Sequence, residues 1–284
     1  MASASAMGEF QLPPPRLPGG PYVMGVLNVT PDSFSDGGER QGEAAAPHAL
    51  AMLEAGADII DIGGESTRPG AEAVEAAEEI ARIVPVIGAL RALTRAPISI
   101  DTMKPQVAAA AIAAGASIWN DVAALREPGA LETAASLQRP VILMHMQGEP
   151  RTMQNNPHYD DVAAEVIAFL RERVAGARAT GVQSIWVDPG IGFGKTLEHN
   201  LELLRSVRRI GDETGCPVLI GASRKRFIQA LDERATDARK GRLGGSVAAA
   251  LLAAQQGAAI VRVHDVAETV QALKVWRAIE RSPM

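Results

Sequence analysis

The regular alternation of short apolar runs with longer alanine-rich segments constrains the fold of this chain more than any other feature. The runs are too short for helices and are apolar on both faces, as are strands buried on both sides of a parallel sheet. There are eight of them, at residues 22–27, 58–62, 97–100, 116–119, 140–144, 184–187, 217–220 and 259–263. Apolar residues recur with helical spacing in the intervening segments, at residues 44–53, 76–93, 105–114, 161–180, 200–214 and 246–256.

Glycines mark the ends of several predicted helices, just before the next apolar run. They are Gly56, Gly115, Gly181, Gly215 and Gly257. Glycine commonly ends a helix because it adopts the left-handed conformation without strain. Eight strand-then-helix units predict a single (β/α)8 TIM barrel, with a doubly wound open sheet as the alternative. A similar glycine–alanine sequence precedes three of the runs. This similarity indicates equivalent repeated units, and it therefore favours the closed barrel.

Composition limits the classes of protein to consider. The chain has 284 residues, 47% hydrophobic and 21% charged, which suits a globular domain with a real core. A net charge of −5 predicts no nucleic-acid partner. The single cysteine, Cys216, excludes an internal disulfide framework and suits the cytoplasm. The start is rich in alanine, serine and then proline, so we predict a flexible lead-in over residues 1–20 and one domain over residues 21–284. No apolar stretch is long enough to predict a membrane span.

Polar or ionisable residues follow every one of the eight runs. In a barrel of this kind the active site lies at the carboxyl ends of the strands, so these side chains should meet at one mouth. They are Asn28, Asp61, Asp101, Asn120, His145, Asp188, Ser223, Lys225, Arg262 and His264. A single such residue is usually a turn or helix cap, but eight converging strand ends predict a buried polar pocket.

The predicted pocket combines two kinds of chemistry. Asp101, Asn120, Asp188 and Lys225 offer the acceptors and donors that suit a flat nitrogen heterocycle. A second set suits phosphate oxygens, and consists of Asn28, Arg68, Ser223, Arg262 and His264. The Asn28 side chain is also a hard oxygen ligand that could join a Mg²⁺ held mostly by phosphate and water. The substrate predicted from these residues is a phosphorylated nitrogen heterocycle.

Two long glycine-bearing loops should cover this mouth. The first, N-V-T-P-D-S-F-S-D-G-G, spans residues 28–38, and the second, D-I-G-G-E-S-T-R-P-G, spans residues 61–70. We predict that these loops, which follow the first and second strands, are mobile lids that exclude water from a reactive electrophile.

The two loops and five further motifs resemble the dihydropteroate synthase family. The others are S-I-D-T at 99–102, M-H-M-Q-G at 144–148, D-P-G-I-G-F-G-K at 188–195, G-A-S-R-K at 221–225 and R-V-H-D-V at 262–266. The resemblance implies a (β/α)8 barrel that joins 6-hydroxymethyl-7,8-dihydropterin diphosphate to p-aminobenzoate in folate biosynthesis. It further implies a transferase that is assisted by Mg²⁺, is a cytoplasmic homodimer and is the target of sulfonamides.

The resemblance also implies roles for individual residues. The expected pterin contacts are Asp101, Asn120, Met144, Asp188, Lys225 and Arg262. The expected diphosphate contacts are Asn28, Arg68, Ser223, Arg262 and His264, with Asn28 as the metal ligand. The expected p-aminobenzoate contacts are Thr67, Arg68, Pro69, Phe193, Gly194, Lys225 and Arg226. Asp101, Asp188, Lys225, Arg262 and His264 are the expected catalytic residues.

The expected reaction needs no strong base, because the aryl amine is already a nucleophile. The electron-rich dihydropterin ring can delocalise positive charge, so loss of diphosphate can run ahead of amine attack, as in an SN1 reaction. Two alternatives remain open from the sequence. One is a methyltransferase acting on methyltetrahydrofolate, which would need neither the second lid nor the diphosphate set. The other is a catalytically silent pterin- or phosphate-binding protein.

Overall fold

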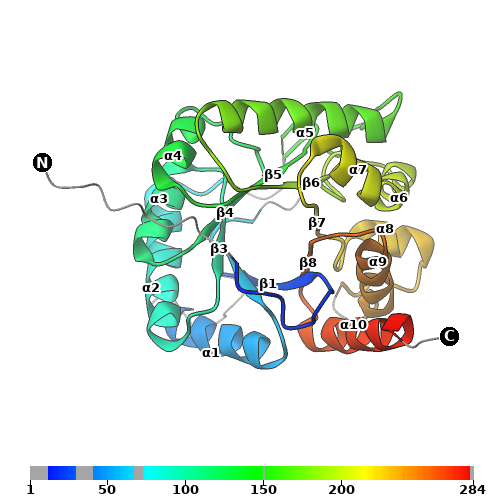
Figure 1. The fold of residues 1–284 in the computed structure, drawn as a ribbon, viewed down its shortest axis with the longest axis horizontal. Helices are drawn as coiled ribbons and strands as arrows, with labels where there is room; N and C mark the ends of the chain where they lie inside the picture. Colours follow the sequence, from blue (N-terminus) through cyan, green and yellow to red (C-terminus); the bar gives the residue numbers. More distant parts are fainter. Residues whose placement is uncertain (1–11, 30–40, 67–72, 150, 239, 282–284) are drawn as a thin grey trace, which may run out of the picture.

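The computed structural model describes residues 12–29, 41–66, 73–149, 151–238 and 240–281, and within them eight parallel strands form a barrel surrounded by helices (Figure 1). The strands are β1 (Tyr22–Asn28), β2 (Ile59–Gly63), β3 (Ile98–Asp101), β4 (Ile118–Asp121), β5 (Val141–Met144), β6 (Ile185–Asp188), β7 (Leu219–Ile220) and β8 (Ile260–Val263).

The strand order is that of a barrel rather than of a doubly wound sheet. Hydrogen bonds join the strands in the order β6-β5-β4-β3-β2-β1-β8-β7, which follows the sequence around a ring. An isolated parallel bridge between Val187 and Val218 joins the two outer strands and nearly closes that ring. The predicted (β/α)8 barrel is therefore confirmed, and the open sheet is wrong.

Most of the predicted helices are present, with some differences. The helices are α1 (Gln41–Glu54), α2 (Ala76–Leu93), α3 (Pro105–Ala114), α4 (Ala130–Leu137), α5 (Val162–Ala179), α6 (Leu197–Arg205), α7 (Val207–Thr214), α8 (Arg226–Leu231), α9 (Leu243–Gln255) and α10 (Val266–Arg281). The segment predicted as one helix over residues 200–214 is divided at Ser206 into α6 and α7. The predicted ranges omitted α4, α8 and α10. The first two are too short to show a repeated period.

Glycine residues end the helices where the sequence predicts. The five expected positions all have positive φ, between 63° and 117°, at Gly56, Gly115, Gly181, Gly215 and Gly257. A side chain is strained in this conformation, so glycine lets the chain turn at once from each helix into the next strand.

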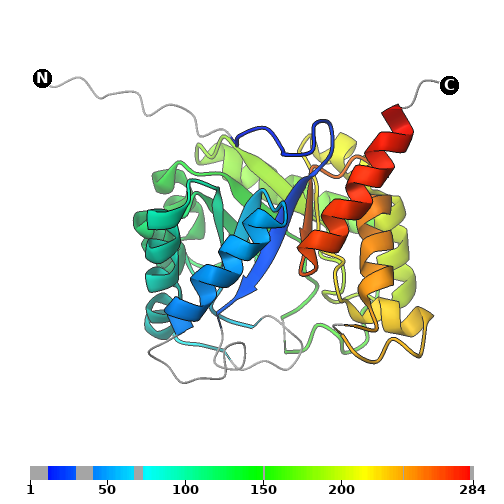
Figure 2. The same cartoon turned by 90° about the horizontal axis from the view of Figure 1, so that it is seen from below.

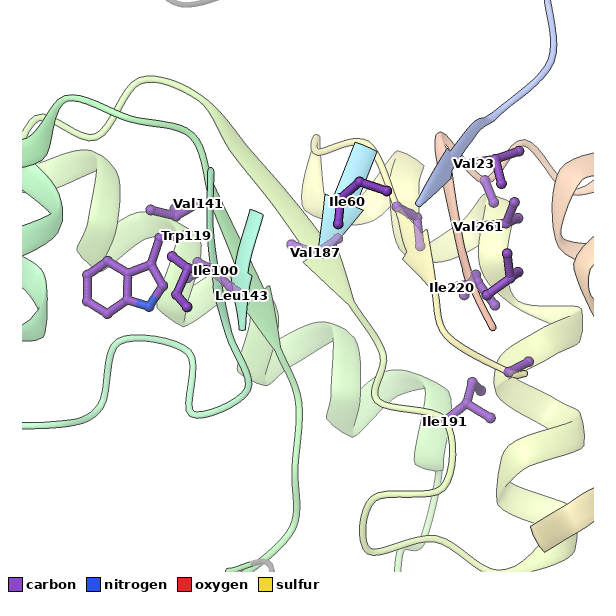
Figure 3. Close-up of a cluster of buried hydrophobic side chains, with 14 of the residues drawn as sticks. Val23, Ile60, Ile100, Trp119, Val141, Leu143, Val187, Ile191, Ile220 and Val261 are labelled. Atoms are coloured by element: carbon purple, nitrogen blue, oxygen red, sulfur yellow. The ribbon is translucent and has the colours of Figure 1, made fainter. Parts of the chain in front are cut away.

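The strands bury both faces, and the alternation of their side chains divides the core into two layers. Residues facing outward pack against the helices, among them Val23, Ile60, Trp119, Val187 and Val261 (Figure 3). Residues facing inward form a second apolar cluster, which fills the barrel on the side of the amino ends of the strands. This cluster consists of Met24, Ile59, Ile118, Ile142, Leu219 and Ile260. Burying one such side chain contributes roughly 1.5–3 kcal/mol. The next inward position on each strand is therefore close to the carboxyl end of the barrel.

The two ends of the barrel differ. The described part of the lead-in lies at the amino ends of the strands, where Leu12 packs on the inner cluster and the backbone N–H of Arg16 donates to Asp58 Oδ1 at 2.8 Å (Figure 2). The domain boundary after residue 20 and the flexibility of residues 1–20 stay predictions. Most of the first predicted lid, and Thr67, Arg68 and Pro69 of the second, lie outside the described residues. Among the helices described, none is long and apolar enough to cross a membrane.

Candidate active site

The inward-facing positions above the apolar layer bring the predicted pocket residues together. A cavity of about 20 Å³ opens there, at the carboxyl ends of the strands. Its walls are Asp101, Asn120, Val122, Met144, Asp188, Ile191, Phe193, Gly221, Lys225 and Arg262. All six residues of the expected pterin set are among them, although they come from six different strand ends.

A partly buried arginine at the end of β8 joins two aspartates across this cavity. Arg262 Nε lies 2.6 Å from Asp61 Oδ2, and Arg262 Nη2 lies 2.6 Å from Asp101 Oδ2. Asn120 Nδ2 donates to the same Asp61 oxygen at 3.2 Å. Burial opposes the charged guanidinium, but Asp61 and Asp101 outweigh it and raise the pKa of Arg262. The arginine is therefore permanently charged and fixed in place by its two partners.

Two carboxylates in the cavity wall can accept further hydrogen bonds from a ligand. Asp101 Oδ1 is buried and has no hydrogen-bond partner within the described part of the chain. Asp188 Oδ1 accepts from the backbone N–H of Gly190 at 2.7 Å. Burial raises the pKa of both groups, against the lowering effect of Arg262 on Asp101 and of the Gly190 N–H on Asp188. Buried acceptors of this kind are satisfied when a ligand brings N–H donors to them.

The mouth of the cavity is framed by an ammonium over an aromatic ring. Lys225 Nζ lies 4.0 Å from the centre of the Phe193 ring, a cation–π contact. Gly194, which follows Phe193, has φ +62°, and its carbonyl accepts from the hydroxyl of Tyr159 at 2.8 Å. Arg226 is exposed and begins α8 directly after Lys225. These residues of the expected p-aminobenzoate set therefore lie at one side of the opening.

Only some of the residues expected to contact the diphosphate lie close together among those described. Ser223 Oγ lies 3.1 Å from His264 Nδ1 and accepts from the His264 backbone N–H at 3.2 Å. Asn28 ends β1, and its Oδ1 lies 3.9 Å from where a Cβ would stand on Gly63. Within the described ranges, no three His, Cys, Asp or Glu side chains are grouped to hold a metal ion. Any Mg²⁺ here would therefore take most of its oxygen ligands from phosphate and water.

The sequence predicted Asp61 at the mouth of the barrel but in no ligand set, and the structure shows that it is the buried partner of Arg262. The signal was present, because Asp61 interrupts the fully buried run Ile59-Ile60-Asp61-Ile62 at an inward-facing position. A carboxylate there needs a cationic or hydrogen-bonding partner. Gly221 was also missed. It lines the cavity where a Cβ would stand 3.9 Å from both Arg262 and Asp188.

A larger hollow lies elsewhere on the surface, between the start of α5 and α6. Its volume is about 520 Å³, and it is open and lined by side chains of both charges, including Asp160, Glu198 and Arg205. Of the two, the strand-end cavity is the better candidate for the active site, although it is smaller. Buried polar groups converge on this cavity and not on the surface hollow.

Comparisons with known proteins show which family the chain belongs to. A profile of the family described as pterin binding enzyme matches residues 24–264. The dihydropteroate synthase of Escherichia coli K12 is 50% identical over 262 residues, which cover 91% of each chain. The structure of Xanthomonas albilineans dihydropteroate synthase with 4-aminobenzoic acid is 54% identical, covers 93% of this chain and 94% of that one, and has a TM-score of 0.87. The Yersinia pestis enzyme in a sulfonamide drug complex is 46% identical, covers 93% and 95%, and has a TM-score of 0.87.

Proposed function

This chain belongs to the pterin binding enzyme family, and on that premise we propose that its strand-end cavity is the active site of a dihydropteroate synthase. The enzyme is a transferase of folate biosynthesis. It condenses 6-hydroxymethyl-7,8-dihydropterin diphosphate with p-aminobenzoate, and the products are 7,8-dihydropteroate and diphosphate. The observation that carries the assignment of the site is the convergence of six strand ends on one small polar cavity.

The pterin ring is bound by the deep wall of the cavity. Asp101 and Asp188 accept hydrogen bonds from its N–H donors, and Met144 packs against the ring. The Asn120 carboxamide supplies both a hydrogen-bond donor and an acceptor. A free volume of about 20 Å³ holds roughly one water, so side chains at the mouth must move when the ring enters. Lys225 and Arg262 donate to the ring or lie over its face.

The diphosphate lies further out, toward β7 and β8. Ser223 and His264 are already in contact there, and Arg262 and Arg68 add charge. The donor set fits Mg²⁺, because Asn28 offers one hard oxygen and the diphosphate and water would supply the rest. When bound, the metal neutralises charge on the leaving group.

The reaction begins with departure of the diphosphate, in the manner of an SN1 reaction. The pterin methylene loses its C–O bond while the ring nitrogen delocalises the positive charge. Asp101 and Asp188 favour that cation electrostatically, while Arg262 and His264 stabilise the leaving group. The amine of p-aminobenzoate then attacks the methylene carbon and loses its proton. No residue has to act as a nucleophile.

The aryl acceptor binds at the mouth, against Phe193 and Lys225. Gly194 and Arg226 border this slot, and Thr67, Arg68 and Pro69 of the second predicted lid close it. A sulfonamide has the same aryl amine as p-aminobenzoate and an anionic group at the opposite side of its ring. It therefore competes with p-aminobenzoate for this slot.

We also infer that the protein is a cytoplasmic homodimer. The outer surface of α9 and α10 carries the exposed apolar side chains Leu252, Val275 and Ile279. An apolar surface shared by two neighbouring helices suits a two-fold contact between copies. Light scattering of the purified protein tests this inference, and a monomer at assay concentration would contradict it.

A coupled assay for diphosphate release tests the function. The protein with pterin diphosphate, p-aminobenzoate and Mg²⁺ should release diphosphate and form dihydropteroate, and Asp188→Asn should lose both. Omission of p-aminobenzoate is the control for simple hydrolysis. If diphosphate release needs no aryl amine, or does not occur, the assignment is wrong.

A further inference from the structure

A buried cation lies directly behind the wall of the cavity. Lys195 follows the glycine-rich segment 188–194 and is only 4% exposed. Its Nζ donates to the Phe193 carbonyl at 2.9 Å and lies 3.0 Å from His145 Nδ1. None of the ion pairs found within the described ranges includes Lys195. The ammonium therefore has neutral acceptors as its nearest partners.

Such an arrangement is costly for the fold. A buried charge without a paired carboxylate loses its hydration, and an apolar side chain of similar volume usually stabilises a core better. Burial lowers the pKa of Lys195 to about 7, and Asp188 only partly opposes this effect. His145 adds no charge, because burial and Lys195 lower the pKa of its imidazole to about 2. Packing alone does not explain an amine at this position.

The contacts of Lys195 point to the acceptor slot. Phe193, whose carbonyl it holds, presents its ring 4.0 Å from Lys225 Nζ at the cavity mouth. The rest of the segment is held by other groups, since Asn200 Oδ1 accepts from Gly192 N and Tyr159 donates to Gly194 O. Among the hydrogen bonds found in the described chain, the one from Lys195 is the only side-chain bond to the Phe193 backbone.

We propose that Lys195 is a positioning residue, whose buried ammonium fixes the backbone of Phe193 so that its ring frames the slot for the aryl acceptor. The proposal rests on the proposed function, because that function supplies the acceptor. It assigns to Lys195 an effect on acceptor binding, and little effect on the pterin, whose proposed contacts lie at the strand ends in the deep wall of the cavity.

The charge of Lys195 gives the proposal a pH signature. The groups that face it from the surrounding elements are His145, Tyr159, Asp188, His199 and Lys225. Because its pKa is lowered to about 7, Lys195 is charged below that pH and loses its charge as the pH rises through it. A charged donor makes a hydrogen bond roughly twice as strong as a neutral one, so the KM for p-aminobenzoate should rise roughly three- to tenfold from about pH 6 to about pH 9.

The experiment compares Lys195→Met with Lys240→Met, which makes the same change at an exposed site. At about pH 6, loss of one charge-assisted bond should raise the KM for p-aminobenzoate about tenfold in Lys195→Met. Calorimetry should show pterin diphosphate binding within about threefold of wild type. The rise of KM with pH should disappear in Lys195→Met and persist in Lys240→Met.

Two results would overturn the proposal. One is an unchanged acceptor KM in Lys195→Met, and the other is an equal loss of pterin and acceptor binding, which indicates a merely structural lysine. If Lys195→Met does not fold, the wild-type profile decides, because an acceptor KM that is flat with pH contradicts the proposal. Absence of turnover in wild type would instead refute the proposed function.

Discussion

Replacing Asp61 by asparagine should destabilise the protein and weaken pterin binding together. The Asp61 side chain is fully buried, and its Oδ2 binds both Arg262 and Asn120. Asparagine keeps the size of the side chain but removes the charge that Arg262 Nε contacts at 2.6 Å. Breaking a buried ion pair costs about 3–5 kcal/mol. We expect about 3 kcal/mol, the lower end of that range, because Arg262 keeps its second pair with Asp101.

Urea unfolding followed by circular dichroism measures this loss of stability. For a domain of this size, a loss of about 3 kcal/mol corresponds to a fall in Tm of roughly 6–12 °C. The matched control is Asp232→Asn, which removes the aspartate of an exposed pair with Arg234 and should leave the stability unchanged. The losses in Asp61→Asn and Arg262→Met should not add in the double variant, because both changes break the same ion pair; the double variant still leaves Asp101 without Arg262.

The functional consequence follows from the geometry. Asp61 fixes both Asn120 and Arg262, so the variant should bind pterin diphosphate about tenfold more weakly by calorimetry, for about 1.4 kcal/mol. If Asp61→Asn unfolds within about 1 kcal/mol of wild type, the ion pair does not have the role argued from its burial. If stability falls but pterin affinity does not, Asp61 holds the barrel together without orienting the site.

Three further changes test other parts of the site. Gly190→Ala should cost about 3 kcal/mol or more in urea unfolding, because its Cβ would lie 1.9 Å from the His145 carbonyl oxygen. Gly129→Ala, with a similar φ of +78° and open space, should cost only about 1 kcal/mol. Burial raises the pKa of Asp101, so its charged form is lost as pH falls, beginning above the ordinary carboxyl range. Pterin affinity should fall with it, and Asp101→Asn should bind weakly with a smaller dependence on pH, which Asp188 still supplies because burial raises its pKa as well. Ser223→Ala should weaken diphosphate inhibition about fivefold, for about 1 kcal/mol, because the His264 ring loses its hydrogen bond with the Ser223 hydroxyl.

The fold was predictable from the sequence because its signals are local. Strands buried on both faces appear as short apolar runs, and the glycines at the helix ends mark where each run begins. The polar cavity at the strand ends was predictable for the same reason, since polar residues follow every run. The helices α4 and α8 were not predictable in this way, because eight and six residues are too few to show a period.

What the sequence did not reveal is which side chains satisfy one another. Asp61 and Arg262 are 201 residues apart, and their ion pair exists only because β1 joins β2 to β8 in the closed ring. The same ring places Lys195 behind Phe193 and next to His145, which follows a different strand. The groups proposed to bind substrate lie at strand ends and can be found one motif at a time. The groups that fix them belong to other strands, so their roles follow only from the assembled barrel.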